Sequence, residues 1–127
     1  MLYASSSAKD TDWFLTLSEE KADGEIFTLA QGKIRARYRA SLAKPEMLKP
    51  GEVVAYTLDL WHTGITIPKG SKLRVEVASA LFPSFSRNLN TGGHNETETK
   101  FVKAHQKIFH SEKHPSHILL PVLPDVK

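Results

Sequence analysis

Apolar and polar residues alternate along most of this chain, a pattern typical of strands that bury one face. Residues 33–39 read Lys-Ile-Arg-Ala-Arg-Tyr-Arg, which predicts a half-buried strand with Ile34, Ala36 and Tyr38 inside and the three arginines outside. Residues 72–78 repeat the pattern, with Leu73, Val75 and Val77 inside. Residues 53–61 are apolar on both faces and predict a central strand. Shorter runs complete the predicted set at residues 2–7, 12–19, 26–30, 101–110 and 117–122.

Turn residues separate these runs. Asp23-Gly24 predicts a hairpin between the strands at 12–19 and 26–30, since glycine tolerates a positive φ. No segment keeps a helical period over three turns. Short strands with regular turns favour an all-β domain, a β-sandwich or jelly roll that spans residues 1–127 as one unit. Residues 82–99 form the longest irregular stretch, and loops of that length are often functional.

Composition narrows the function classes. The 127 residues include no cysteine, so a thiol nucleophile and cysteine-bound metal centres are excluded. The net charge is only +3, and the 17 Lys and Arg residues are scattered among 14 acidic ones, which predicts no nucleic-acid partner. No apolar run reaches the length of a membrane span, and the first residues lack the features of a signal peptide. We therefore expect no membrane partner and favour a cytoplasmic location.

No catalytic residue emerges from the sequence. The Gly-x-Ser-x-Gly turn that presents the nucleophile of an α/β-hydrolase is absent, so we expect the chain alone to be inactive. His110, His114 and His117 could approach a zinc ion, but Pro115 favours a polar hairpin with surface histidines. Asp10 and Asp12 could contact Ca²⁺, but two carboxylates are too few, and a turn-ordering role is favoured. We expect no cofactor and no metal.

The arginine stripe at Arg35, Arg37 and Arg39 could face phosphates. It lacks interleaved surface aromatics, and acidic residues on a neighbouring strand could pair across it. A solvated or domain-facing strand is the favoured interpretation.

Several segments, in this order, resemble one family. They are residues 6–14 (Ser-Ser-Ala-Lys-Asp-Thr-Asp-Trp-Phe), 32–39, 56–61, 82–92 (Phe-Pro-Ser-Phe-Ser-Arg-Asn-Leu-Asn-Thr-Gly), 108–116 and 119–122. Together they are similar to the C-terminal domain of the X-Pro dipeptidyl-peptidase and cocaine-esterase-like serine hydrolases, a group that includes α-amino acid ester hydrolases. Asp-Thr-Asp and Arg-Asn-Leu-Asn-Thr-Gly are the most specific segments.

The resemblance implies a jelly roll of galactose-binding-like topology that packs on an α/β-hydrolase domain, in the same chain or a separate one. It implies a non-catalytic role in shaping substrate access, for a parent enzyme that hydrolyses peptide or ester bonds. The parts expected to meet the catalytic domain are two loops, with candidate residues Asp10, Asp12, Trp13, Phe14, Phe82, Phe85, Arg87, Asn88 and Asn90. The alternatives are a free-standing carbohydrate-binding jelly roll and a structural oligomerisation domain.

The family domain usually has at least one strand upstream of the segment that matches residues 2–5. The resemblance therefore predicts that N-terminal strands are missing and that an edge or apolar patch is exposed. We expect the isolated domain to self-associate through such an edge.

Overall fold

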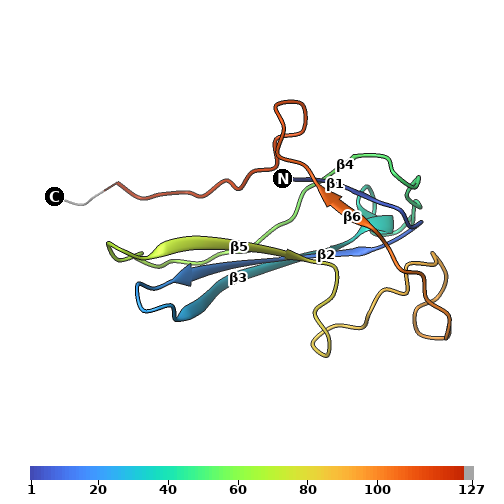
Figure 1. The fold of residues 1–127 in the computed structure, drawn as a ribbon, viewed down its shortest axis with the longest axis horizontal. Coiled ribbons are helices and arrows are strands. Elements are labelled where there is room, and N and C mark those ends of the chain that lie inside the picture. Colours follow the sequence, from blue (N-terminus) through green and yellow to red (C-terminus); the bar gives the residue numbers. More distant parts are fainter. Residues whose placement is uncertain (125–127) are drawn as a thin grey trace.

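The computed structural model describes residues 1–124, and in that part the chain forms two three-stranded antiparallel sheets (Figure 1). One sheet has the order β4-β1-β6 and the other β3-β2-β5. The elements are β1 (Leu2–Ser6), β2 (Asp12–Glu20), β3 (Ile26–Arg35), a short 3-10 helix η1 (Ala36–Tyr38), β4 (Val54–Tyr56), β5 (Lys72–Ala78) and β6 (Gln106–Ile108). The all-β prediction is thus confirmed. No helix within residues 1–124 has the length and apolar content to cross a membrane.

The larger sheet is built on the predicted hairpin. Gly24 adopts a φ of +88° in the turn, and its N–H donates to the carbonyl of Lys21. β2 and β3 pair from Glu20 opposite Ile26 to Asp12 opposite Arg35, with a bulge on β3 beside Leu17 and Ser18. β5 pairs along the other side of β2. The single bulge changes which residues of β3 share a face with Asp12.

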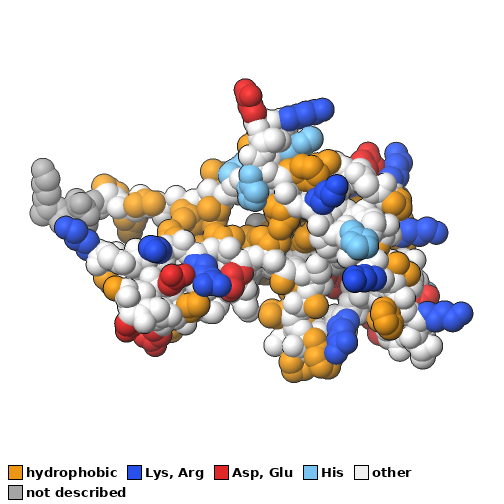
Figure 2. All heavy atoms as spheres, viewed as in Figure 1, with side chains coloured by type: hydrophobic (Ala, Val, Ile, Leu, Met, Phe, Trp, Pro, Cys, Tyr) orange, Lys and Arg blue, Asp and Glu red, His pale blue; other side chains and the backbone are white. Residues whose placement is uncertain are grey.

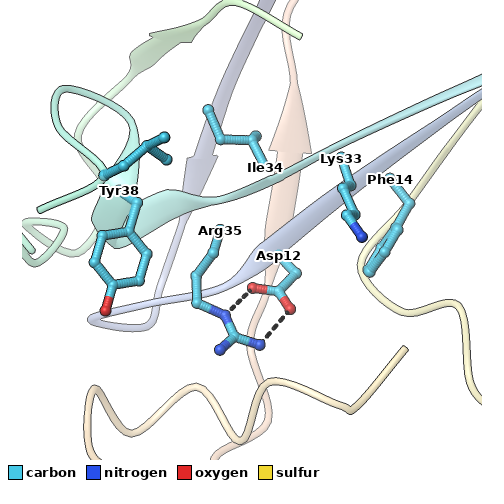
Figure 3. Close-up of a pocket in the computed structure, with 7 residues that line it drawn as sticks. Asp12, Phe14, Lys33, Ile34, Arg35 and Tyr38 are labelled. Carbon is cyan, nitrogen blue, oxygen red and sulfur yellow. Dashed lines mark hydrogen bonds and ion pairs between the residues drawn. The ribbon is translucent and has the colours of Figure 1, made fainter. Parts of the chain in front are cut away.

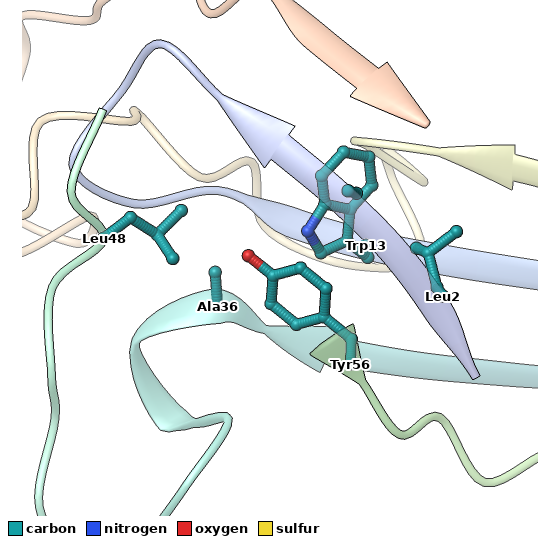
Figure 4. Close-up of a cluster of buried hydrophobic side chains, with 6 residues drawn as sticks. Leu2, Trp13, Ala36, Leu48 and Tyr56 are labelled. Carbon is teal, nitrogen blue, oxygen red and sulfur yellow. The ribbon is translucent and has the colours of Figure 1, made fainter. Parts of the chain in front are cut away.

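The core lies where β1 and β4 cover the Asp12 end of the larger sheet (Figure 4). Trp13 and Tyr56 pack with ring centroids 5.9 Å apart, and burial raises the pKa of the Tyr56 hydroxyl above its usual value. The buried members of this cluster are Leu2, Ala4, Trp13, Ala36, Leu48 and Tyr56. Gly32 of β3 allows a further close approach, because a Cβ there would lie 2.5 Å from the carbonyl oxygen of Asp59. These contacts fix the two sheets against each other at one end.

The strand predicted at residues 33–39 is wrong in its second half. The runs at 26–30 and 33–39 join into one strand that ends at Arg35, and η1 follows. The backbone turns there because the Asp10 carboxylate accepts a hydrogen bond from the N–H of Arg37. Arg37 is consequently 9% exposed rather than solvated, so the prediction of an outward arginine stripe fails at this residue.

Three other predicted strands are shorter in the structure. Residues 53–61 contribute only Val54–Tyr56, at the edge of the smaller sheet and not at its centre. Residues 101–110 contribute only Gln106–Ile108, and residues 117–122 have no assigned strand. Leu73 and Val75 share a face of the larger sheet with Leu17, as their registers require, yet are 47% and 44% exposed. The larger sheet is therefore covered at one end and exposed at the other.

The histidine segment forms a turn, as expected from Pro115. His110 and Pro115 make an isolated antiparallel bridge, and the N–H of His114 donates to the carbonyl of Ser111. The His114 ring packs on Tyr3 and Phe109. Within residues 1–124, no three His, Asp or Glu side chains gather as a set that could hold a metal ion.

Candidate functional site

Asp10 and Asp12 lie at the end of the larger sheet, where the chain passes from β1 into β2. Asp10 is fully buried and Asp12 is 5% exposed. A buried carboxylate is costly unless hydrogen bonds and an opposite charge compensate it. Both side chains have such partners, and we call the group formed by Asp10, Asp12, Arg35, Arg37 and Asn88 the aspartate cluster.

Arginines of β3 and η1 neutralise the two carboxylates. Arg35 binds Asp12 through two parallel hydrogen bonds, Nε to Oδ1 at 2.9 Å and Nη2 to Oδ2 at 3.0 Å (Figure 3). The hydrogen bond to Asp12 raises the pKa of the Arg35 guanidinium further above its usual value. Arg37 donates from Nε to Asp10 Oδ2 at 2.7 Å. Two-point contacts of this kind fix geometry as well as charge.

The long loop between β5 and β6 is anchored by the same cluster. The side-chain amide of Asn88 donates to Asp10 at 2.7 Å and to Asp12 at 2.8 Å. Arg37 Nη2 donates to the carbonyl of Gly93 at 3.0 Å. Asn90 adopts a φ of +63°, and its side-chain amide donates to the carbonyl of Val102. Two segments far apart in sequence are therefore locked together by buried polar groups.

Aromatic side chains lie beside this anchor, with Phe14 buried at 6% exposure and Phe82 at the surface. Phe14 and Phe85 pack with ring centroids 5.4 Å apart, and Lys33 Nζ lies 3.5 Å from the centroid of Phe85. Phe82 is 61% exposed, and the guanidinium carbon of Arg87 lies 4.5 Å from its ring centroid. We call Phe14, Phe82 and Phe85, with the cations Lys33 and Arg87, the aromatic strip. Aromatic rings with arginine are enriched at protein–protein interfaces.

A pocket of about 300 Å³ opens next to the aromatic strip (Figure 3). Its walls are mostly apolar, and the Arg35–Asp12 pair lies in it with the charges already satisfied. Leu42, which is 90% exposed, stands in its lining. The residues that line it are Asp12, Phe14, Lys33, Ile34, Arg35, Tyr38 and Leu42.

The structure divides the residues predicted from sequence into three groups. The first group holds the loop between β5 and β6 through hydrogen bonds and consists of Asp10, Asp12, Asn88 and Asn90. The second group forms the aromatic strip and consists of Phe14, Phe82, Phe85 and Arg87. Trp13 belongs to neither group, because it packs against Tyr56 in the core between the two sheets. Sequence reasoning missed Lys33, Arg35 and Arg37 as members of the site. A signal existed for Arg35, since acidic residues on a neighbouring strand were expected to pair across the stripe.

Comparisons with known proteins identify the family of this chain. Residues 1–119 match the family described as the X-Pro dipeptidyl-peptidase C-terminal non-catalytic domain. The chain belongs to this family. It is 36% identical over 124 residues to cocaine esterase from Rhodococcus sp. (strain MB1 Bresler), which covers 96% of this chain and 22% of that protein. The chain therefore spans about a fifth of the length of this curated relative.

Solved structures show the same partial correspondence. An aminopeptidase from the marine sediment archaeon Thaumarchaeota archaeon superposes with a TM-score of 0.81 at 27% identity, over 90% of this chain and 21% of that one. An α-amino acid ester hydrolase superposes with a TM-score of 0.82 at 25% identity, over 89% of this chain and 20% of that one. The chain is the non-catalytic C-terminal domain of hydrolases of the X-Pro dipeptidyl-peptidase and cocaine-esterase type.

Proposed function

We propose that this domain packs on an α/β-hydrolase domain through the aromatic strip and helps to shape access to that domain's active site. The parent enzyme would hydrolyse peptide or ester bonds, as the names of the related aminopeptidase and esterases suggest. The two described sheets would form part of a jelly roll of galactose-binding-like topology. The catalytic domain would lie in the same polypeptide or in a second chain.

One observation carries the docking proposal: an exposed aromatic side chain stands on a rigid base. Phe82 projects from the long loop at 61% exposure. That loop is held through Asn88 by the buried carboxylates of Asp10 and Asp12. Burying a large aromatic residue on a preorganised surface gives binding energy without a large ordering cost. The neighbouring Lys33 and Arg87 favour an acidic rim on the partner.

The docking test uses the hydrolase that carries this domain, joined or supplied as two chains. In the two-chain form, Phe82→Ala with Phe85→Ala should weaken association at least about tenfold, as expected for central aromatic residues of an interface. In the joined form, the same change should alter KM for an X-Pro anilide and for an ester substrate. Phe27→Ala is the matched control, because Phe27 is 53% exposed at the other end of the same sheet. Equal effects of the two variants would overturn the proposed surface.

The domain alone should hydrolyse neither substrate above the rate in buffer. The expectation follows from the absence of a nucleophile turn, and it is checked with both substrates at high protein concentration. Turnover that a serine-directed reagent abolishes would contradict it.

A further inference from the structure

A second pocket, of about 350 Å³, shares Arg35 and Tyr38 with the pocket of Figure 3. One of its walls is η1 with the segment that follows it, and the other wall is the part of the long loop at residues 92–96. Polar groups form most of its lining, whereas the first pocket is mostly apolar. The docking proposal makes no use of this second pocket.

Backbone and side-chain contacts hold the two walls in place. The N–H of Glu46 donates to the carbonyl of Arg37 at 2.7 Å, which fixes the segment after η1. Arg37 Nη2 donates across to the carbonyl of Gly93 at 3.0 Å and joins the walls. The N–H of Glu98 donates to the carbonyl of His94 at 3.0 Å, and a Cβ at Gly93 would collide with the Glu98 carboxylate. The pocket is therefore preformed, as ligand sites usually are.

Arg35 and Arg37 each keep one guanidinium nitrogen free of protein partners. Arg35 uses Nε and Nη2 on Asp12. Arg37 uses Nε on Asp10 and Nη2 on the Gly93 carbonyl. Within residues 1–124, Nη1 of neither arginine has a hydrogen-bond partner, and Figure 3 shows the third nitrogen of Arg35 turned away from Asp12. Arg37 is otherwise buried, and its Nη1 is not sealed in the interior, so this donor opens where Arg37 lines the pocket.

The loop wall offers an acceptor to match these donors. Glu96 is exposed, and its carboxylate makes no hydrogen bond or ion pair with any residue in the described part of the chain. The hydrogen bond to Asp12 is the largest cause of the raised pKa of Arg35, and the negative charge of Glu96 adds to it. Glu96 therefore faces the guanidinium groups without contacting them.

The charges around the pocket disfavour a simple ion. Two guanidinium groups face three carboxylates, those of Asp10, Asp12 and Glu96, so a free anion meets a surplus of negative charge. A free cation meets the two unused arginine donors. Figure 2 shows basic and acidic side chains interspersed at this end of the molecule, so the surrounding surface does not select one sign either. The ligand that fits must carry an acceptor and a donor.

We propose that this pocket binds a neutral amide group of a peptide. The carbonyl oxygen of the amide would accept hydrogen bonds from Nη1 of Arg35 and Arg37, and its N–H would donate to Glu96. An amide presents an acceptor and a donor side by side and adds no charge, so it matches both walls, whereas a carboxylate or an ammonium group matches only one. Pro45 and Met47 supply apolar contacts for the carbon atoms beside the amide. This site is separate from the aromatic strip and does not depend on docking through it.

The test titrates the isotope-labelled chain with N-acetylglycinamide and, separately, with acetate and methylammonium, and follows the signals by NMR. The amide should give saturable shifts at Gly93, Glu96 and the two arginine side chains, with a Kd on the order of 1 mM for so small a ligand. It should bind about tenfold more tightly than either ion, because each ion leaves one wall without a hydrogen bond.

Glu96→Ala separates a binding role from a general loss of structure. It removes the acceptor for the amide N–H and also relieves the repulsion of an anion. Binding of the amide should therefore weaken about tenfold, while binding of acetate should become tighter. Glu112→Ala is the matched control, because Glu112 is an exposed carboxylate in the histidine turn and does not line the pocket. It should change neither affinity.

Three results would overturn the proposal: no saturable shifts at the pocket, an ion that binds as tightly as the amide, or a change of both affinities in the same direction in Glu96→Ala. Repeating the titration on the hydrolase that carries this domain identifies the source of the amide. Shifts that persist there identify a free peptide as the ligand. A pocket closed to the probe assigns the amide to the hydrolase's own chain, and Glu96→Ala must then weaken association of the two chains. A failure of docking through Phe82 leaves the titration of this chain unchanged, so the two proposals fail separately.

Discussion

At the loop end of the molecule, the aspartate cluster buries carboxylates and guanidinium groups, and each of them has a defined partner. At the opposite end, near the hairpin turn and the C-terminal segment, leucine and valine side chains stand half exposed on a sheet that would ordinarily bury them. The charges of the aspartate cluster at the loop end are all paired within the domain, whereas apolar side chains at the open end remain exposed to solvent. Buried charge must be compensated within the domain, since a buried charge without its partner costs several kcal/mol of stability. The hydrophobic effect is non-directional, so the rest of an assembly can cover an exposed apolar surface.

The largest effect is expected when the Asp10 carboxylate at the loop end is removed. Asp10→Ala leaves the Arg37 charge buried without its ion-pair partner and takes one acceptor from Asn88. We expect a loss of about 3–5 kcal/mol in the free energy of unfolding, measured by urea denaturation. The loop between β5 and β6 should also become sensitive to proteases.

The control for Asp10 is an ion pair of similar length on the surface. Lys21 and Glu25 lie 2.6 Å apart and are well exposed. Glu25→Ala should leave the melting temperature nearly unchanged, because solvent screens exposed pairs. A large loss in both variants would show that pairing at the loop end is no more important than pairing at the surface.

A second test compares two leucines, one in the core and one at the open end. Leu2 is 4% exposed in the core, and Leu119 is 83% exposed at the open end. Leu2→Ala should cost about 2–5 kcal/mol of stability, whereas Leu119→Ala should change it little. Thermal or urea unfolding of the two variants gives the difference directly. A substantial loss at Leu119 would mean that the open end is already covered in the isolated chain.

The sequence predicted most of the fold where local patterns decide it. Alternation located the strands that became β2, β3 and β5, and Asp23-Gly24 located their hairpin. It failed at residues 53–61 and 117–122, because a strand also needs a partner and alternation does not report one. The same limit applies to Leu73 and Val75, which the alternation placed inside but which are 47% and 44% exposed in the structure.

The aspartate cluster was harder to predict than the strands. Counting back from the pair Glu20–Ile26 without a bulge would place Asp12 opposite Ile34, on the wrong face of the hairpin. The bulge shifts the register by one residue and brings Arg35 opposite Asp12. Asp10 and Asn88 are separated by most of the chain, so no local pattern joins them. The aromatic strip was easier to predict, because the family resemblance marked the segments that contain Phe14, Phe82, Phe85 and Arg87.

The smallest expected effect concerns association through a sheet edge. β3 is an edge strand with Ile26 and Phe27 about half exposed, whereas the opposite edge, β5, carries Lys72 and Arg74, charges that discourage pairing. We expect the isolated chain to self-associate weakly through β3 and Phe27→Lys to weaken that association on the order of tenfold. Sedimentation over a range of concentrations measures both. Phe101→Lys is the control, because Phe101 is 76% exposed but lies outside the strands. A clean monomer of the unaltered chain at high concentration would show that exposed apolar residues at this edge do not suffice for pairing.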